Sequence, residues 1–257
     1  MKNLTYSTAV VVLACGLAAS ASASECSGNC GTLGADGVVT ASPMGGDYQY
    51  VSTNGGLNYV GSLGISGVNQ TNGSLYVSDS FSVLAGDSLQ FYFNYITSDG
   101  SGSYTDYAWA ALRPTNGGDD IILFTARTTP TGNTVPGFGL PGLADGVVLD
   151  PDSTPIIAEA PVWSPLGGSS GVCFSVGCGY TGWIGMDYLF ADAGIYSLLF
   201  GVTNVGDSSY DSGLAFAGLT INNKPIDEPT VPEPASMALV GLGLLGLGLA
   251  RRRKLTA

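Results

Sequence analysis

The residue types that could carry chemistry in this 257-residue chain are carboxylates, aromatic rings and cysteines, because the sequence contains no histidine. The absence of imidazole excludes Ser-His-Asp and Cys-His nucleophile pairs, histidine zinc sites and the commonest general base. A glycosidase would need two acids about 5–10 Å apart across a cleft. Nothing in the sequence singles out two of the 20 acidic residues for that task. We therefore expect a protein that is not an enzyme.

Four of the five cysteines stand in two close pairs, Cys26 with Cys30 in CSGNC and Cys173 with Cys178 in CFSVGC. Four cysteines in an exported chain indicate two disulfides. Neither pair has the C-x2-C spacing typical of a zinc site. Pairing within each motif would close two small loops, and the sequence leaves the crossed pairings open.

Asp106, Asp207 and Asp211 are the candidate ligands of a metal ion. They could meet at one edge of a β-sandwich, and carboxylates with backbone oxygens suit Ca²⁺. No D-x-[DN]-x-[DN]-G run accompanies them, and aspartates often accept backbone N–H bonds at the start of turns. Calcium is therefore the one cofactor for which the sequence offers ligands, and turn capping is the alternative.

Tyr180, Trp183 and Tyr188 are the candidate glycan-binding residues, since they lie together in GCGYTGWIGMDY beside the second cysteine pair. Aromatic faces can cover the apolar C–H face of a pyranose ring. The alternative is ordinary packing, because large aromatic side chains mostly fill the cores of such folds. We expect core packing for Trp109, and core packing is also the favoured interpretation for Trp183.

Short strands separated by turns are the elements that must position these side chains. Residues 87–96 alternate regularly, with Leu89, Phe91, Phe93 and Tyr95 on one face. Asn-Gly and Asp-Gly pairs along the chain are typical of hairpin turns. Strands are also predicted at 106–113, 120–127, 194–204 and 212–221, with weaker candidates at 48–52, 57–60, 74–84, 147–149 and 172–176.

Many short strands with frequent turns predict an all-β fold, an antiparallel two-sheet sandwich or jelly roll, over residues 24–222. Residues 128–170 are rich in proline and are therefore poor strand material. We expect this stretch to be a long ordered loop across one end of the sandwich. Long loops of that kind often carry function.

Met1–Ala23 has the features of a secretory signal peptide, in which Lys2 precedes an apolar core and Ala21-Ser22-Ala23 offers a cleavage site. A lipoprotein signal with Cys15 as the lipidated residue is the alternative. The body that follows is strongly acidic, because all but one of the 20 acidic residues lie between Ser24 and Thr230. Such a surface repels phosphate backbones, which excludes nucleic acid as a partner.

Three further segments follow the predicted sandwich. Residues 223–234 form a proline-spaced linker that suits neither a helix nor a central strand. Residues 235–250 carry no charge, and as a helix they would span about 24 Å against a hydrocarbon core of about 30 Å. This predicts a short transmembrane helix, with residues 251–257 as a basic cytoplasmic tail.

The C-terminal arrangement resembles the PEP-CTERM sorting signal: Val231-Pro232-Glu233-Pro234, then a glycine-rich apolar stretch, then Arg251-Arg252-Arg253. The resemblance implies processing by an exosortase, with transient anchoring in the inner membrane, after signal peptidase has removed the N-terminal segment. It further implies that the protein ends at the cell surface or in the extracellular matrix. Bacteria with such proteins are Gram-negative and make exopolysaccharide.

Residues 200–221 are also similar to the closing strands of other exported PEP-CTERM β-sandwich proteins, which commonly end in D-S-(G/A)-L-x-(F/I)-D-x-(L/V). The chain keeps Asp211-Ser212-Gly213-Leu214 but has Ala217 at the second aspartate. No activity follows from this similarity. We expect an exported structural or adhesive protein without enzymatic activity. The alternative is a glycan-binding module, with or without calcium, whose partner is an exopolysaccharide or another glycan.

Overall fold

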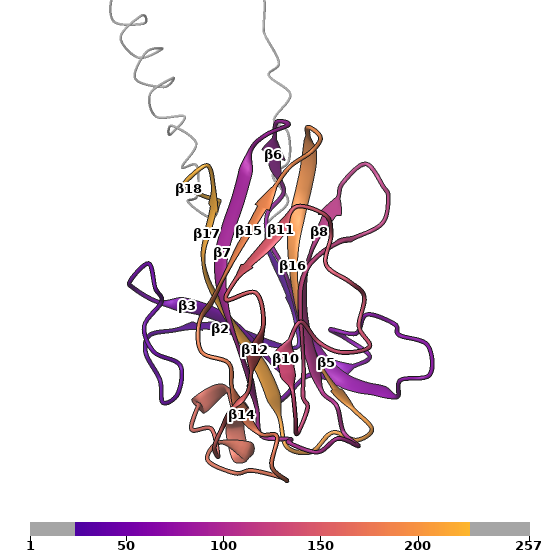
Figure 1. Cartoon of the computed structure of the whole chain (residues 1–257), viewed down its shortest axis with the longest axis vertical. Helices are drawn as coiled ribbons and strands as arrows, with labels where there is room; N and C mark the ends of the chain where they lie inside the picture. The colour runs from indigo at the N-terminus through magenta and orange to yellow at the C-terminus, as the bar shows by residue number, and fades with distance from the viewer. Residues whose placement is uncertain (1–23, 227–257) are drawn as a thin grey trace, which may run out of the picture.

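The computed structural model describes residues 24–226, which fold into two antiparallel β-sheets packed face to face (Figure 1). The prediction of an all-β, antiparallel fold is confirmed. The predicted signal peptide, the helix over 235–250 and the basic tail lie outside the described residues. Within the range 24–226, the chain has no helix with the length and apolarity that a membrane span requires.

Sheet one has the strand order β1-β5-β16-β8-β9, with β4 paired to β5 and β6 paired to β16. Its long central strand, β16, lies between β5 and β8. The strands are β1 (Glu25–Ser27), β4 (Leu57–Asn58), β5 (Gln70–Val77), β6 (Phe81–Val83), β8 (Tyr107–Pro114), β9 (Ile121–Arg127) and β16 (Gly194–Val205).

Sheet two has the order β11-β15-β7-β17-β3-β2, with β7 and β17 as its two longest strands. Short strands extend it, since β14 pairs with β7 and β13, and β18 pairs with β17. The strands are β2 (Asn29–Leu33), β3 (Tyr48–Ser52), β7 (Ser88–Thr97), β11 (Val147–Asp150), β13 (Ile157–Ala158), β14 (Gly179–Tyr180), β15 (Ile184–Leu189), β17 (Ser212–Ile221) and β18 (Lys224–Pro225).

The main core lies between the two sheets and follows from alternation along their strands. Leu89, Phe91, Phe93 and Tyr95 of β7 all point into it, as their spacing predicts. The rings of Phe93 and Phe124 stack across the sheets with centroids 3.7 Å apart. Burying each such side chain contributes about 1.5–3 kcal/mol to folding. Because these side chains face the core, the residues between them on β7 face the outer side of sheet two.

Two smaller clusters cover the outer faces of the sheets. The proline-rich stretch 128–170 contains β10 (Asn133–Val135), β12 (Thr154–Pro155), β13 and the 3-10 helix η1 (Ser164–Ser169). It places Trp163 on the outer face of sheet two, where the indole N–H donates to the Tyr48 hydroxyl at 2.9 Å. On sheet one, Trp109 is 3% exposed and its indole N–H donates to the Gly61 carbonyl at 2.7 Å. The expected core packing of Trp109 is confirmed.

The structure differs from the predicted strands at several places. The predicted strand at 74–84 is two strands, β5 and β6, and the sequence did not predict β1, β2 or β14. The predicted loop at 128–170 also contains the short strands β10, β12 and β13. The prediction of a strand at 172–176 is wrong, because a disulfide between Cys173 and Cys178 closes a loop there. In that loop Phe174 forms only an isolated bridge to Asp99. Strand β15, which the sequence did not predict, lies between β11 and β7 in sheet two. Glycines around and within it obscure its alternation.

Candidate functional site

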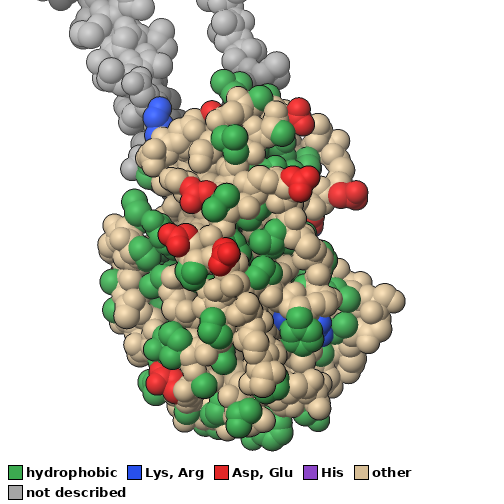
Figure 2. Space-filling model, in the orientation of Figure 1, with side chains coloured by type: hydrophobic (Ala, Val, Ile, Leu, Met, Phe, Trp, Pro, Cys, Tyr) green, Lys and Arg blue, Asp and Glu red, His purple; other side chains and the backbone are tan. Residues whose placement is uncertain are grey.

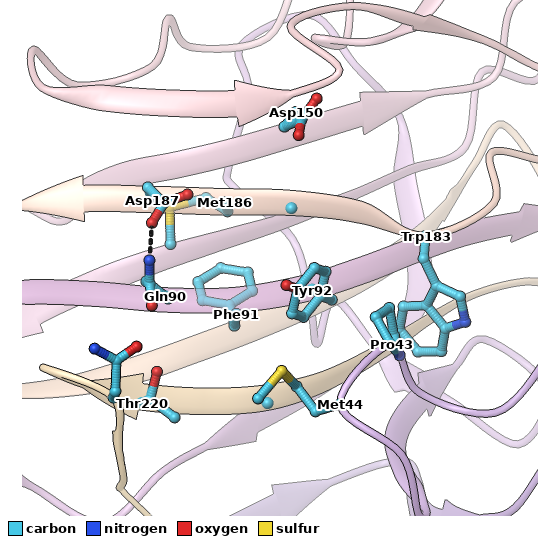
Figure 3. A pocket seen from close by; sticks show the side chains of 13 residues that line it. Pro43, Met44, Gln90, Phe91, Tyr92, Asp150, Trp183, Met186, Asp187 and Thr220 are labelled. Carbon is cyan, nitrogen blue, oxygen red and sulfur yellow. Dashed lines mark hydrogen bonds between the residues drawn. The ribbon is translucent and has the colours of Figure 1, made fainter.

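A groove of about 470 Å³ crosses the outer face of sheet two over β15, β7 and β17. It lies on the side of the sheet opposite the main core, at the end of β17 that leads into β18. Figure 3 shows Tyr92 in the middle of the groove, with Trp183 and Pro43 on one side and the hydrogen-bonded pair Gln90 and Asp187 on the other.

Strand register brings these side chains together from distant parts of the sequence. On β7 the residues between the core positions, Gln90 and Tyr92, point outward because successive side chains alternate between faces. In the pairing with β15, Tyr92 lies opposite Gly185 and Gln90 lies opposite Asp187. Asp150 of β11 lies opposite Gly185 on the other side of β15. The neighbouring strands β7, β15 and β11 therefore each contribute lining residues, and β17 contributes Gly218 and Thr220.

Two glycines form the floor of the groove on either side of the Tyr92 ring. A Cβ atom at Gly185 would lie 3.6 Å from Tyr92 Cε1 and 3.7 Å from the Asp150 carbonyl oxygen. A Cβ at Gly218 would lie 3.3 Å from Tyr92 Cδ2 and 2.9 Å from Met44 Cγ. Gly218 also has a φ of +70°, at an irregularity in the pairing of β17 with β7, so the backbone there favours glycine. The groove is hollow because these two positions lack side chains.

Trp183 is a half-buried aromatic wall at one end of the groove. Its indole N–H donates to both the hydroxyl and the carbonyl of Thr40, at 3.2 Å and 3.3 Å. Its ring makes an edge contact with Tyr48, with centroids 5.8 Å apart. These contacts hold the indole in place and leave part of it open to the groove, as a preformed binding surface requires.

The polar lining of the groove combines two carboxylates with hydroxyl and amide groups, which Tyr92, Thr220 and Asn223 contribute. The Asp187 carboxylate accepts a hydrogen bond from the Gln90 amide. The Asp150 side chain is exposed and receives no hydrogen bond from any residue between 24 and 226. No Lys or Arg lines the groove. Figure 2 shows the wider setting, in which red acidic side chains are spread over the upper part of the visible face and blue basic ones are sparse.

The three predicted glycan-binding residues do not lie on one surface. Trp183 and Tyr180 both pack against the cluster around Trp163 on the outer face of sheet two, but only Trp183 also lines the groove. Tyr188 is 7% exposed and points into the main core, where its ring lies 5.2 Å from that of Phe190. Asp187 and Tyr188 are adjacent in β15, so one faces the groove when the other faces the core.

The predicted metal ligands Asp106, Asp207 and Asp211 each have structural partners. Asp106 is buried and accepts bonds from the Val205 amide at 2.8 Å and the Ser212 hydroxyl at 2.7 Å. Burial raises the pKa of Asp106 well above its usual range, and the Ser212 hydrogen bond opposes that rise.

Asp211 accepts the hydroxyls of Thr53 and Ser169, both at 3.0 Å, and Asp207 accepts the Ser209 amide at 2.9 Å. The Asp207 contact is the turn capping that the sequence offers as the alternative to a metal. Among residues 24–226, no group of three or more Cys, Asp or Glu side chains is arranged to hold a metal ion.

Both predicted disulfides form within their own motifs. Cys26 bonds Cys30 and Cys173 bonds Cys178. Neither disulfide lines the groove. Each disulfide closes a short loop. The closed loops reduce the number of conformations open to a glycine-rich unfolded chain.

Comparison with known proteins identifies the C-terminal signal and nothing in the body. The family model of the PEP-CTERM protein-sorting motif matches residues 230–254. No curated protein and no solved structure matches the chain. The predicted sorting residues Val231–Pro234 and Arg251–Arg253 fall within the matched range, which lies outside the described residues. The motif indicates an exported, membrane-processed protein that is a substrate of an exosortase. The similarity of residues 200–221 to other such proteins stays a prediction.

Proposed function

We propose that this chain is a non-enzymatic, adhesive protein of the cell surface or extracellular matrix, and that its β-sandwich adheres by holding a glycan in the outer-face groove. The sorting motif supports the location, since it indicates export and processing at the membrane. The groove supports the binding role. The single observation that carries the proposal is the placement of Tyr92 and Trp183 in one groove with the carboxylates of Asp150 and Asp187.

This combination suits sugars because a pyranose has two kinds of surface. Its C–H face is apolar and packs against an aromatic face, while its hydroxyls need hydrogen-bond partners. Tyr92 and Trp183 provide the rings, and Asp150 and Asp187 provide acceptors beside them. The groove is concave and largely preformed, as ligand sites in proteins usually are.

The same side chains favour binding over hydrolysis. A glycosidase needs a general acid held in apolar surroundings and a second carboxylate across the cleft. Asp150 is exposed, and Asp187 is hydrogen-bonded to the Gln90 amide. Retention in a matrix requires only that the glycan is held, so a binding groove without catalysis is sufficient for adhesion.

The test is binding of the mature, processed protein to an array of bacterial and plant polysaccharides. Trp183→Ala and Tyr92→Ala should each remove most of the signal, because each change removes a ring against which the apolar face of a sugar would pack. Tyr59→Ala is the matched control, since Tyr59 is 76% exposed and lies outside the groove. Thermal unfolding of each variant separates lost binding from lost folding. Absence of selective binding by the wild-type protein would refute the proposed function.

A further inference from the structure

The charged side chains that line the groove are two carboxylates, Asp150 and Asp187. The amide of Gln90 is engaged with Asp187, and the indole N–H of Trp183 is engaged with Thr40. The Asp150 carboxylate has no protein donor within residues 24–226. A ligand that fills this groove must therefore bring its own donors to the carboxylates. Sugar hydroxyls are such donors.

None of the cationic side chains of the described residues lines the groove. Arg113 is paired with Asp120 at 2.7 Å. Arg127 is buried, donates to Thr105 and lies 4.8 Å from the centre of the Phe138 ring. Lys224 is exposed in β18 and follows Asn223 at the edge of the groove, but it does not line the groove.

An anionic sugar would thus meet two carboxylates and no partner of opposite charge. Repulsion between like charges is screened by salt beyond about 8 Å under physiological conditions. A sugar lying on the Tyr92 ring would be close to both carboxylates. Asp187 lies on β15, the strand next to that of Tyr92. Asp150 lies on the strand beyond, but a Cβ at Gly185 would lie 3.6 Å from Tyr92 Cε1 and 3.9 Å from Asp150 Cβ, so a single carbon atom would bridge the ring and the Asp150 side chain. The repulsion therefore acts at short range.

We propose that the groove, given the glycan-binding function above on which this inference rests, selects uncharged, hydroxyl-rich glycans and rejects glycans that carry carboxylate or sulfate groups. Asp150 and Asp187 are the specificity-determining residues. They accept hydroxyl hydrogen bonds from a neutral sugar and repel a negatively charged one. The aromatic rings supply affinity that does not depend on ligand charge.

The experiment compares polysaccharides that share a backbone and differ in charge: dextran with dextran sulfate, and hydroxyethylcellulose with carboxymethylcellulose. The mature protein is titrated with each at low and physiological salt, with chitosan as a cationic probe. We expect a neutral member to bind and its anionic derivative to have a dissociation constant at least about tenfold higher. This difference in affinity should become smaller as the salt concentration rises. Trp183→Ala should weaken binding of the neutral member.

The double variant Asp150→Asn/Asp187→Asn tests the cause of the selectivity. It should bring the neutral and anionic members to within about threefold of each other. The control Asp145→Asn/Asp192→Asn makes the same change in net charge at exposed positions outside the groove, and it should leave the gap unchanged. A control variant that closes the gap equally would show that overall charge, not the groove, is responsible.

The possible outcomes distinguish failure of the charge selectivity from failure of the proposed glycan-binding function. Equal binding of neutral and anionic members, lost in Trp183→Ala, would overturn the charge selectivity and keep the groove as a glycan site. The same carboxylates should let chitosan bind better than the anionic members, and chitosan that binds as weakly as those members would overturn the electrostatic cause. Failure of every polysaccharide to bind would overturn the proposed function itself.

Discussion

Filling the floor of the groove should stabilise the protein while it destroys the proposed site. The change is Gly185→Val. Gly185 lies in the middle of β15 with an ordinary extended backbone, and a Cβ there meets its neighbours at 3.6 and 3.7 Å, which is normal van der Waals contact. A β-branched residue is also favoured on a pleated strand.

The magnitude follows from the backbone and the contacts. Glycine within a strand costs roughly 0.5–1 kcal/mol relative to a residue with a side chain. Removing that cost should raise the melting temperature by about 1–4 °C for a body of this size. The two methyl groups would occupy the space between the Tyr92 ring and Asp150. A sugar could then no longer lie flat on the ring, and binding should fall by at least about tenfold.

Calorimetry and polysaccharide titration of the same samples measure both effects. Gly185→Ala should give a smaller loss of binding with a similar gain in stability. Gly218→Val is the contrast, because its positive φ and its 2.9 Å approach to Met44 should make it destabilising. A Gly185→Val protein that binds as the wild type does would refute the location of the site, and a fall in its melting temperature would refute the packing argument.

Three further predictions concern the fold. Burial raises the pKa of Asp99 from 3.8 to about 6; the folded chain therefore binds a proton that the unfolded chain releases, and this contribution to the free energy of unfolding should be lost as the pH rises from about 4 to about 6. Urea unfolding across that range should show the decline, and Asp99→Asn should flatten it; an unchanged slope would contradict the assignment. Replacing Cys26 and Cys30 by serine opens a loop with a sequence separation of 4 and should cost about 2 kcal/mol, whereas an unaltered urea midpoint would show that the disulfide does not constrain the unfolded chain. Trp163→Ala should cost about 3–5 kcal/mol, and a loss below 1 kcal/mol would show that the proline-rich stretch is not anchored by this indole.

The parts of the fold that follow a local pattern could be predicted from the sequence. Alternation in residues 87–96 predicts the core face of β7 correctly, because side-chain direction in a strand depends only on parity. The two disulfides also follow from four cysteines in an exported chain, whereas their local pairing is known only from the structure. The strand at 172–176 was wrong because Val172, Phe174 and Val176 alternate like strand residues, while the disulfide holds their backbone in a loop.

The groove could not be predicted because its residues come from separate strands and meet only through register. Tyr92, Asp150 and Gly218 are far apart in the sequence, and no local motif marks them as a set. The spacing of two aromatic residues did carry some information about the groove. Trp183 and Tyr188 differ by an odd number of residues, so a regular strand through both would place them on opposite faces. That parity could be used only once β15 was known to be a strand.

The most direct test of the groove as a glycan site uses the 3 tryptophans of the chain. Trp109 and Trp163 are buried, whereas Trp183 is half-buried at the groove. Their indole N–H signals in a solution NMR spectrum can be followed during titration with a neutral oligosaccharide. The account predicts that the Trp183 signal shifts in a saturable way while the other two stay in place. A Trp183 signal that stays in place while the oligosaccharide demonstrably binds would contradict it.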